Sequence, residues 1–179
     1  MKIKKFKFKQ VVSTNKTAIR IIKTTRSING MIISDLQKKG KGQYGKKWIS
    51  YKGNLFLSFF FKINKITTPI NKITKINCLL VKKLISKYYK KDIIFKPPND
   101  LLIKKKKICG ILQEIFINDD QKYLIVGIGL NVTKSPIIRN YPTTNLFELT
   151  NKKINIDHLA NKLKLIFETN FSKYCKNII

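Results

Sequence analysis

Four short segments carry residue types and spacings that could bind an anion or a nucleotide. The first is a glycine-rich stretch, G-K-G-Q-Y-G, at residues 40–45. This pattern is typical of a dinucleotide-binding turn, but such a turn is followed by a helix and by an acid about twenty residues later. Here an aromatic run follows, and the next acidic residue is Asp92. The stretch therefore predicts either an amide-rich loop that wraps an anion or an ordinary basic surface loop.

The second segment, K-P-P-N-D at residues 96–100, places a lysine, an amide and a carboxylate between two β-prone runs. Asp100 belongs to a set of only nine acidic residues. A lone carboxylate suits Mg²⁺, which often takes one or two carboxylates together with phosphate oxygens. The alternative interpretation is a simple Pro-Asn-Asp turn.

The third and fourth segments place glycines inside β-prone runs, K-I-C-G-I-L-Q-E at residues 107–114 and G-I-G-L-N-V at residues 127–132. Glycine weakens a strand unless something must approach its backbone closely. Two such strands favour a ligand lying across a sheet, and the alternative is two β-bulges. Strict alternation would put Lys107 and Cys109 on one face and Ile108 and Gly110 on the other.

Hydrophobic periodicity indicates the elements that must position these segments. It predicts strands at residues 3–12, 30–34, 54–63, 92–103, 108–117 and 123–132, and helices at residues 16–23, 69–89 and after Asp157. The Ser-Thr-Asn sequence at residues 13–15 and Asp157 are candidate helix caps. Polar turns join the last three strands, which favours an antiparallel meander. Regular βαβ alternation is lacking, so the expected class is α+β.

Composition excludes several classes of protein. The chain has 179 residues, 43% of them hydrophobic, which suits one globular domain rather than a disordered segment. Its net charge of +29 would suit nucleic acid or a membrane surface. However, 35 of the 38 basic residues are lysines, and lysine, isoleucine and asparagine all have AT-rich codons. Compositional drift therefore explains the charge better than a dedicated nucleic-acid surface does.

No apolar run is long enough for a transmembrane helix or a signal peptide. The chain has one histidine, His158, and its three cysteines, Cys78, Cys109 and Cys175, are far apart. A zinc site or a disulfide framework is therefore not expected. We expect a reduced, cytoplasmic protein.

In their order and spacing the four segments, together with residues 13–15, resemble the catalytic domain of biotin protein ligase (biotin–[acetyl-CoA-carboxylase] ligase). That family has an S-T-N motif, a G-R-G-R-x-G-R-x-W loop, K-W-P-N-D, K-x-x-G-I-L and G-x-G-x-N. The matching segments here are S-T-N at 13–15, G-K-G-Q-Y-G-K-K-W at 40–48, K-P-P-N-D at 96–100, K-I-C-G-I-L at 107–112 and G-I-G-L-N at 127–131. The resemblance implies an α+β fold shared with lipoate ligases and class II aminoacyl-tRNA synthetases.

The resemblance also implies roles for individual residues. Biotin binding would involve Ser13, Thr14, Asn15, Gln37, Lys41, Gly42, Gln43, Lys107, Gly110, Gly127 and Gly129. ATP binding would involve Gly40, Gly45, Lys46, Trp48, Lys96, Asn99, Asp100 and Asn131, with Asp100 also on Mg²⁺. Lys107 would be catalytic, in contact with both the biotin carboxylate and the α-phosphate.

Three departures from the family pattern affect the anion site. Lys41, Gln43 and Lys46 stand where the family loop has arginines. A lysine keeps the charge but loses the planar bidentate grip on phosphate, and a glutamine loses the charge as well. Pro97 replaces the family's aromatic residue, which alters an apolar wall of the implied nucleotide pocket.

The implied activity is ATP-dependent ligation of biotin to a lysine of a biotin carboxyl carrier protein or domain. Alternatives are a lipoate or octanoate ligase of the same superfamily and a basic nucleic-acid-binding protein. We expect a single catalytic domain over residues 1–179. Because the S-T-N motif begins at residue 13 and the last predicted helix ends the chain, we expect no helix-turn-helix domain, no C-terminal β-barrel, no specific nucleic-acid binding and no membrane partner.

Overall fold

The computed structural model describes residues 1–25, 27–63 and 69–174. At its centre is a seven-stranded sheet with the strand order β1-β2-β3-β7-β6-β5-β4. The strands are β1 (Lys4–Val11), β2 (Asn29–Gln37), β3 (Leu55–Ile63), β4 (Ile94–Lys96), β5 (Asp100–Ile103), β6 (Lys106–Asn118) and β7 (Gln121–Leu130). β1 and β2 are parallel, and the other neighbours are antiparallel.

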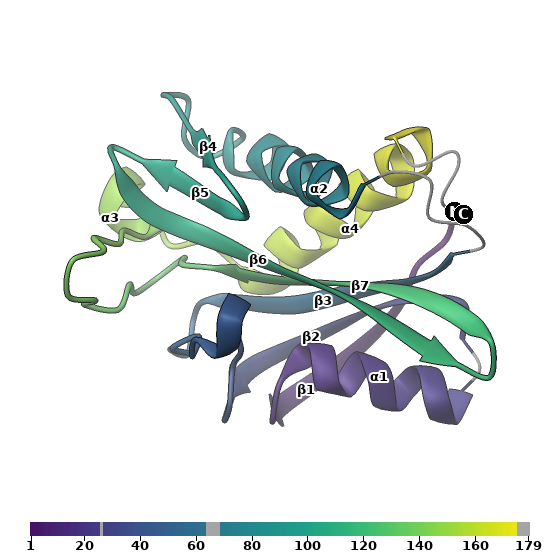
Figure 1. Cartoon of the computed structure of the whole chain (residues 1–179). Helices are drawn as coiled ribbons and strands as arrows, with labels where there is room; N and C mark the ends of the chain where they lie inside the picture. The colour runs from purple at the N-terminus through teal and green to yellow at the C-terminus, as the bar shows by residue number, and fades with distance from the viewer. Residues whose placement is uncertain (26, 64–68, 175–179) are drawn as a thin grey trace.

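Helices cover both faces of this sheet (Figure 1). α1 (Thr14–Thr25) lies on one face, and α2 (Ile70–Ile85) and α4 (Ile156–Tyr174) lie on the other. A short helix, α3 (Leu146–Thr150), and a single 3₁₀ turn, η1 (Gln43–Gly45), belong to the connections. The fold is therefore α+β, as the sequence predicts.

The interior strand β3 is buried on both sides, which explains its nearly continuous apolar sequence. Phe60 packs in the cluster between the sheet and α1. Phe59 and Phe61 point the other way and stack on Phe167 and Phe171 of α4, with ring centroids 4.1 and 4.2 Å apart. The sheet thus lies between two apolar layers, one on each face.

Three sequence predictions about elements are wrong. The strand predicted at residues 92–103 is two strands, β4 and β5, because the two prolines between them lack the N–H that a central strand needs. Asn155, not Asp157, caps α4 by accepting a bond from the His158 amide at 2.9 Å. Asp157 instead pairs with Lys7 of β1 at 2.6 Å. The third error is the omission of α3.

The sequence does carry a signal for the start of α3. Asn145 accepts a bond from the Glu148 amide at 2.8 Å, and the Asn-x-x-Glu spacing matches a capping box.

Within the described residues, no helix is long and apolar enough to cross a membrane. Cys78 and Cys109 are free and buried, burial raises the pKa of Cys78 to about 12, and Cys175 lies outside the described residues.

Candidate active site

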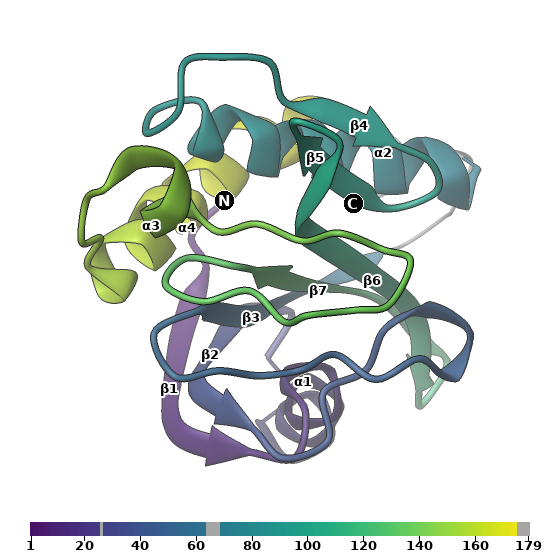
Figure 2. The same ribbon diagram turned by 90° about the vertical axis from the view of Figure 1, so that its left-hand side faces the viewer.

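A cavity of about 850 Å³ opens at one end of the sheet. Two long connections, residues 38–54 and residues 131–145, run across this end of the molecule (Figure 2). Every residue that the sequence nominates as a site residue lines the cavity, except Gly40 and Gly45. Motifs that are up to 118 residues apart in the chain, from Ser13 to Asn131, therefore meet in one place.

One wall of the cavity carries uncharged polar side chains from the start of α1 and from Gln37, and a hydrogen-bond network holds them. The amide and the hydroxyl of Thr14 both donate to Gln37 Oε1, at 2.9 and 3.1 Å. The hydroxyl of Ser58 contacts Thr14 Oγ1 at 2.8 Å and Asn15 Oδ1 at 2.5 Å. Asn15 Nδ2 donates to Glu114 Oε2 at 2.6 Å. The side chains of Thr14 and Asn15 are therefore held across the sheet instead of capping the helix.

Ser58 and Glu114 are positioning residues that the sequence reading missed. Ser58 is fully buried in β3, between apolar neighbours, and Glu114 is one of nine acids in the chain. Ser58 was visible as a polar residue within an apolar run, whereas Glu114 follows Gln113 and had no such signal. Gly127 completes the arrangement, because a Cβ atom at this position would collide with the Asn15 side chain.

Replacing Ser58 with alanine tests this network. The hydroxyl lies behind Thr14 and Asn15, for which the family resemblance implies a role in biotin binding. Its loss should release both side chains and weaken that implied binding about tenfold. Binding of ATP should stay unchanged, as measured by calorimetry with each ligand. Ser34→Ala is the matched control, since Ser34 is equally buried in the neighbouring strand but bonds the backbone of Leu36. Equal losses of affinity for biotin in the two variants would contradict the assignment.

Trp48 lies directly on the two strand glycines. Gly110 and Gly129 are opposite each other in β6 and β7. A Cβ atom at Gly110 would be 2.9 Å from the indole, and one at Gly129 would overlap it. The close approach that the sequence attributes to a ligand is thus made first by the protein's own indole. Trp48 Nε1 is buried and has no hydrogen-bond partner among the described residues.

The glycine-rich loop is a small hairpin beside Trp48. The backbones of Lys41 and Lys47 form an isolated antiparallel β-bridge, and the amide of Gly42 donates to the carbonyl of Lys46 at 2.7 Å. Gly45, at the tip, has a φ of +73° and faces open space. Gly40 admits the returning backbone of the loop, because a Cβ there would be 2.6 Å from the carbonyl oxygen of Trp48. The two glycines outside the cavity lining therefore shape the loop.

The predicted strand alternation fails where β6 begins. The register against β5 shifts, so that Cys109 is opposite Leu101 while Lys107 is opposite the next residue of β5. This β-bulge lets both Ile108 and Cys109 enter the core, whereas Lys107 and Gly110 both line the cavity. The bulge is what turns Lys107 toward the site.

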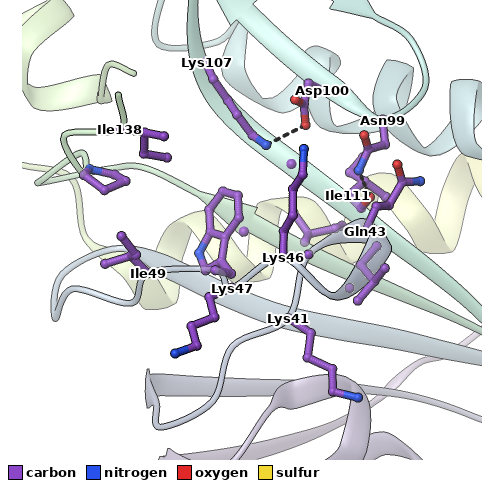
Figure 3. A pocket seen from close by; sticks show the side chains of 18 of the residues that line it. Lys41, Gln43, Lys46, Lys47, Ile49, Asn99, Asp100, Lys107, Ile111 and Ile138 are labelled. Carbon is purple, nitrogen blue, oxygen red and sulfur yellow. Dashed lines mark hydrogen bonds and ion pairs between the residues drawn. The ribbon is translucent and has the colours of Figure 1, made fainter. Parts of the chain in front are cut away.

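Lys107 is paired with Asp100 at the centre of the polar groups (Figure 3). The Lys107 Nζ atom is 2.8 Å from Asp100 Oδ1. It also lies 5.4 Å from the centre of the Trp48 ring. The Asn99 side chain next to Asp100 donates to the carbonyl of Ile111 at 2.6 Å, and this bond fixes the turn between β4 and β5 against β6.

The remaining lining makes the cavity strongly cationic. Lys96 and Arg139 join the lysines already described, and Asp100 is the one carboxylate among the described residues of the lining. Lys47, within the glycine-rich motif, was not nominated as a site residue. Arg139 and Tyr141 were not nominated either, because the sequence offers no spacing signal after Asn131 in the 131–145 connection. Cations in a partly enclosed cavity are suited to polyanionic ligands such as nucleotides.

A family model described as "Biotin/lipoate A/B protein ligase family" matches residues 8–131. This segment contains the polar network, the hairpin, the Lys107–Asp100 pair and both glycine strands. The chain belongs to the biotin/lipoate A/B protein ligase family.

Relatives within the biotin/lipoate ligase family are distant in sequence. The bifunctional ligase/repressor BirA of Bacillus subtilis is 27% identical over 90% of this chain and 52% of its own. The biotin–[acetyl-CoA-carboxylase] ligase of Mycobacterium tuberculosis is 24% identical over 86% of this chain and 59% of its own. The chain thus spans about half the length of the curated relatives that it matches.

Solved structures agree with the family assignment. The biotin protein ligase of Aquifex aeolicus, in complex with biotin and ATP, superposes with a TM-score of 0.80 and 28% identity, over 97% of this chain and 72% of that one. LipL1 of Plasmodium falciparum, in complex with lipoate, has a TM-score of 0.64 at 14% identity and covers 98% of this chain and 62% of that one. The second similarity concerns the fold alone.

Proposed function

We propose that this protein activates biotin with ATP and transfers it to a lysine of a biotin carboxyl carrier protein or domain. The observation that carries the proposal is one continuous cavity in which an uncharged polar wall and a group of cations meet beside Lys107. Its volume of about 850 Å³ is near the upper end of the roughly 300–1,000 Å³ of ligand pockets. The Aquifex aeolicus ligase, solved with biotin and ATP, supports this choice of ligands.

The proposed reaction has two steps. A carboxylate oxygen of biotin attacks the α-phosphorus of ATP, which forms biotinoyl-AMP and releases pyrophosphate. The amine of the acceptor lysine then attacks the acyl carbon, which forms an amide and releases AMP and a proton. The protein's part is to position the reactants, neutralise charge at phosphorus and keep water from the anhydride.

In this proposal the residues divide the work by their chemistry. Thr14, Asn15 and Gln37 bind the neutral ring of biotin. The bond of Thr14 to Gln37 and the bond of Ser58 to Asn15 keep them oriented before the ligand arrives. The cations bind the phosphates. Lys107 lies between the two reacting anions and offsets their repulsion.

Asp100 fits a magnesium ion carried by the nucleotide. No group of three or more His, Cys, Asp or Glu residues gathers among the described residues, so a cage made of protein ligands alone is not provided there. Mg²⁺ is commonly held by one or two carboxylates plus substrate phosphates. Asp100 would supply that carboxylate, and the ion would add positive charge at the phosphates.

Replacing Gln43 with arginine should slow the release of biotinoyl-AMP about tenfold. Gln43 lines the cavity, and an arginine there would add a charge-assisted bond to the phosphate. Release is measured by chasing labelled adenylate with unlabelled compound. Tyr51→Arg is the matched control, because it adds the same charge in the same connection on an exposed side chain that does not line the cavity. Unchanged release for Gln43→Arg, or equal slowing in both variants, would remove Gln43 from the adenylate.

Transfer of labelled biotin to a purified apo carrier domain, with ATP and Mg²⁺, tests the proposed function as a whole. We expect labelling of one acceptor lysine, no reaction with lipoate in place of biotin, and activity that persists at moderate salt. Lipoylation of the acceptor instead would support the alternative activity, that of a lipoate ligase. A cytoplasmic location stays a prediction of the sequence.

A further inference from the structure

Tyr141 bonds directly to the carboxylate of Asp100. Its hydroxyl donates to Asp100 Oδ2 at 2.6 Å, on the oxygen that Lys107 does not use. A tyrosine hydroxyl is ordinarily protonated at neutral pH, so it can donate this bond.

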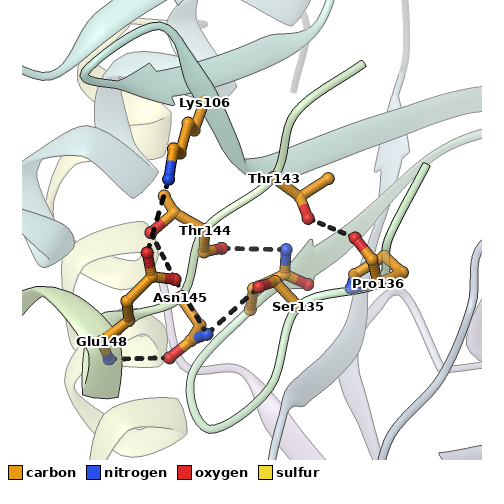
Figure 4. A network of polar contacts seen from close by, with 8 residues as sticks. Lys106, Ser135, Pro136, Thr143, Thr144, Asn145 and Glu148 are labelled. Carbon is orange, nitrogen blue, oxygen red and sulfur yellow. Dashed lines mark hydrogen bonds and ion pairs between the residues drawn. The ribbon is translucent and has the colours of Figure 1, made fainter. Parts of the chain in front are cut away.

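Hydrogen bonds join the two arms of the connection that carries Tyr141 to each other (Figure 4). Thr143 donates to the carbonyl of Pro136, and Asn145 donates to the hydroxyl of Ser135 at 3.2 Å. The connection also pairs with the start of β6, where the amide of Lys107 donates to Pro142 O at 2.8 Å. The ring is thus held at a fixed place relative to Lys107.

The ring of Tyr141 lies close to two lysines of the cavity. The Lys96 Nζ atom is 4.4 Å from its centre and the Lys107 Nζ atom is 5.5 Å from it. Both distances are within the range of cation–π attraction, about 6 Å. Hydroxyl and ring therefore act on different partners, and substitution can separate their effects.

We propose that Tyr141 is a positioning residue. Its hydroxyl holds the Asp100 carboxylate, so that Asp100 pairs with the Lys107 ammonium through one oxygen only. The inference rests on the proposed adenylation, in which Lys107 must leave Asp100 to meet the biotin carboxylate and the α-phosphate. A carboxylate that lacks the tyrosine bond is free to rotate and hold the ammonium with both oxygens. Tyr141 thereby keeps Lys107 available to the substrates.

Tyr141→Phe keeps the ring and removes the hydroxyl. We expect kcat for biotin-dependent exchange of pyrophosphate into ATP to fall about 10- to 100-fold, the effect of a hydrogen bond to a charged group. The KM for ATP should remain nearly unchanged, because the ring still faces Lys96. Tyr141→Ala should lower kcat equally and also raise the KM for ATP, since the cation–π contacts are lost.

Acetylation by limiting acetic anhydride, read by mass spectrometry, gives a measurement that does not depend on ligase activity. In Tyr141→Phe, acetylation of Lys107 relative to Lys104 should fall several-fold, because both carboxylate oxygens then hold the ammonium. An unchanged ratio overturns the inference. A parent protein without biotin-dependent exchange would refute the proposed function, while the acetylation ratio would still decide the role of Tyr141.

Tyr123→Phe is the matched control for loss of a phenol. The Tyr123 hydroxyl also donates to a side chain, Gln121 Oε1, at 3.1 Å, beside the turn between β6 and β7. Its removal should leave kcat and the acetylation ratio as in the parent. A fall in kcat equal to that of Tyr141→Phe would make both effects structural and overturn the inference.

Discussion

Replacing Lys107 with alanine should reduce the rate of biotinoyl-AMP formation by about 10²–10³-fold, or roughly 3–4 kcal/mol. In the adenylation transition state, negative charge builds on the α-phosphate while the biotin carboxylate approaches it. The β-bulge at the start of β6 holds the Lys107 ammonium in the cavity, where Asp100 is its ion-pair partner among the described residues. Single-turnover formation of the adenylate measures the step without contribution from transfer.

The lysines just before Lys107 provide the control. Lys104 and Lys105 are exposed in the turn between β5 and β6, with φ values of +49° and +61°. Alanine at either position should leave adenylation within a few-fold of the parent. Equal, mild effects at Lys104, Lys105 and Lys107 would mean that all three belong to a solvated turn, and would remove Lys107 from the active site.

Replacing Gly129 with alanine should weaken ATP binding about 10- to 100-fold, the effect of overpacking a closely packed contact. The new methyl group would occupy the space of the Trp48 indole, which must then leave the sheet. Trp48 is the single tryptophan of the chain. Its intrinsic fluorescence therefore reports both the displacement of the ring and the titration with ATP.

Gly30→Ala separates this effect from general destabilisation. A methyl group at Gly30 would collide with the ring of Phe60 in the cluster beneath α1, so it also strains the sheet. We expect a lower melting temperature for both variants, but an unchanged fluorescence spectrum and ATP affinity for Gly30→Ala. Equal losses of ATP affinity would show that Gly129 matters only for stability.

The sequence was most informative where a residue type is demanded by the backbone or by a long apolar pattern. β3 and the buried face of α4 follow directly from their apolar residues. The strand glycines correctly indicated a close approach to β6 and β7. The sequence could not say what approaches, because the indole of Trp48 arrives from a loop about 60 residues earlier than Gly110.

The errors arose where a local irregularity changes which side chain faces the site. Simple alternation placed Lys107 and Gly110 on opposite faces, and one bulge brings both to the cavity. Tyr141 lies in an irregular connection without periodicity, so only its three-dimensional position relates it to Asp100. The contact of Ser58 with Asn15 depends on β3 passing behind the start of α1, and the sequence does not show this arrangement.

The most direct test of the proposed function is exchange of labelled pyrophosphate into ATP by the purified chain, with and without biotin. Exchange requires reversible formation of an adenylate and needs no acceptor protein. We expect exchange that depends on biotin and Mg²⁺, is not supported by lipoate, and is lost in Lys107→Ala. Exchange that proceeds equally without biotin, or that is unaffected by Lys107→Ala, would contradict the assignment of this cavity as a biotin-activating site.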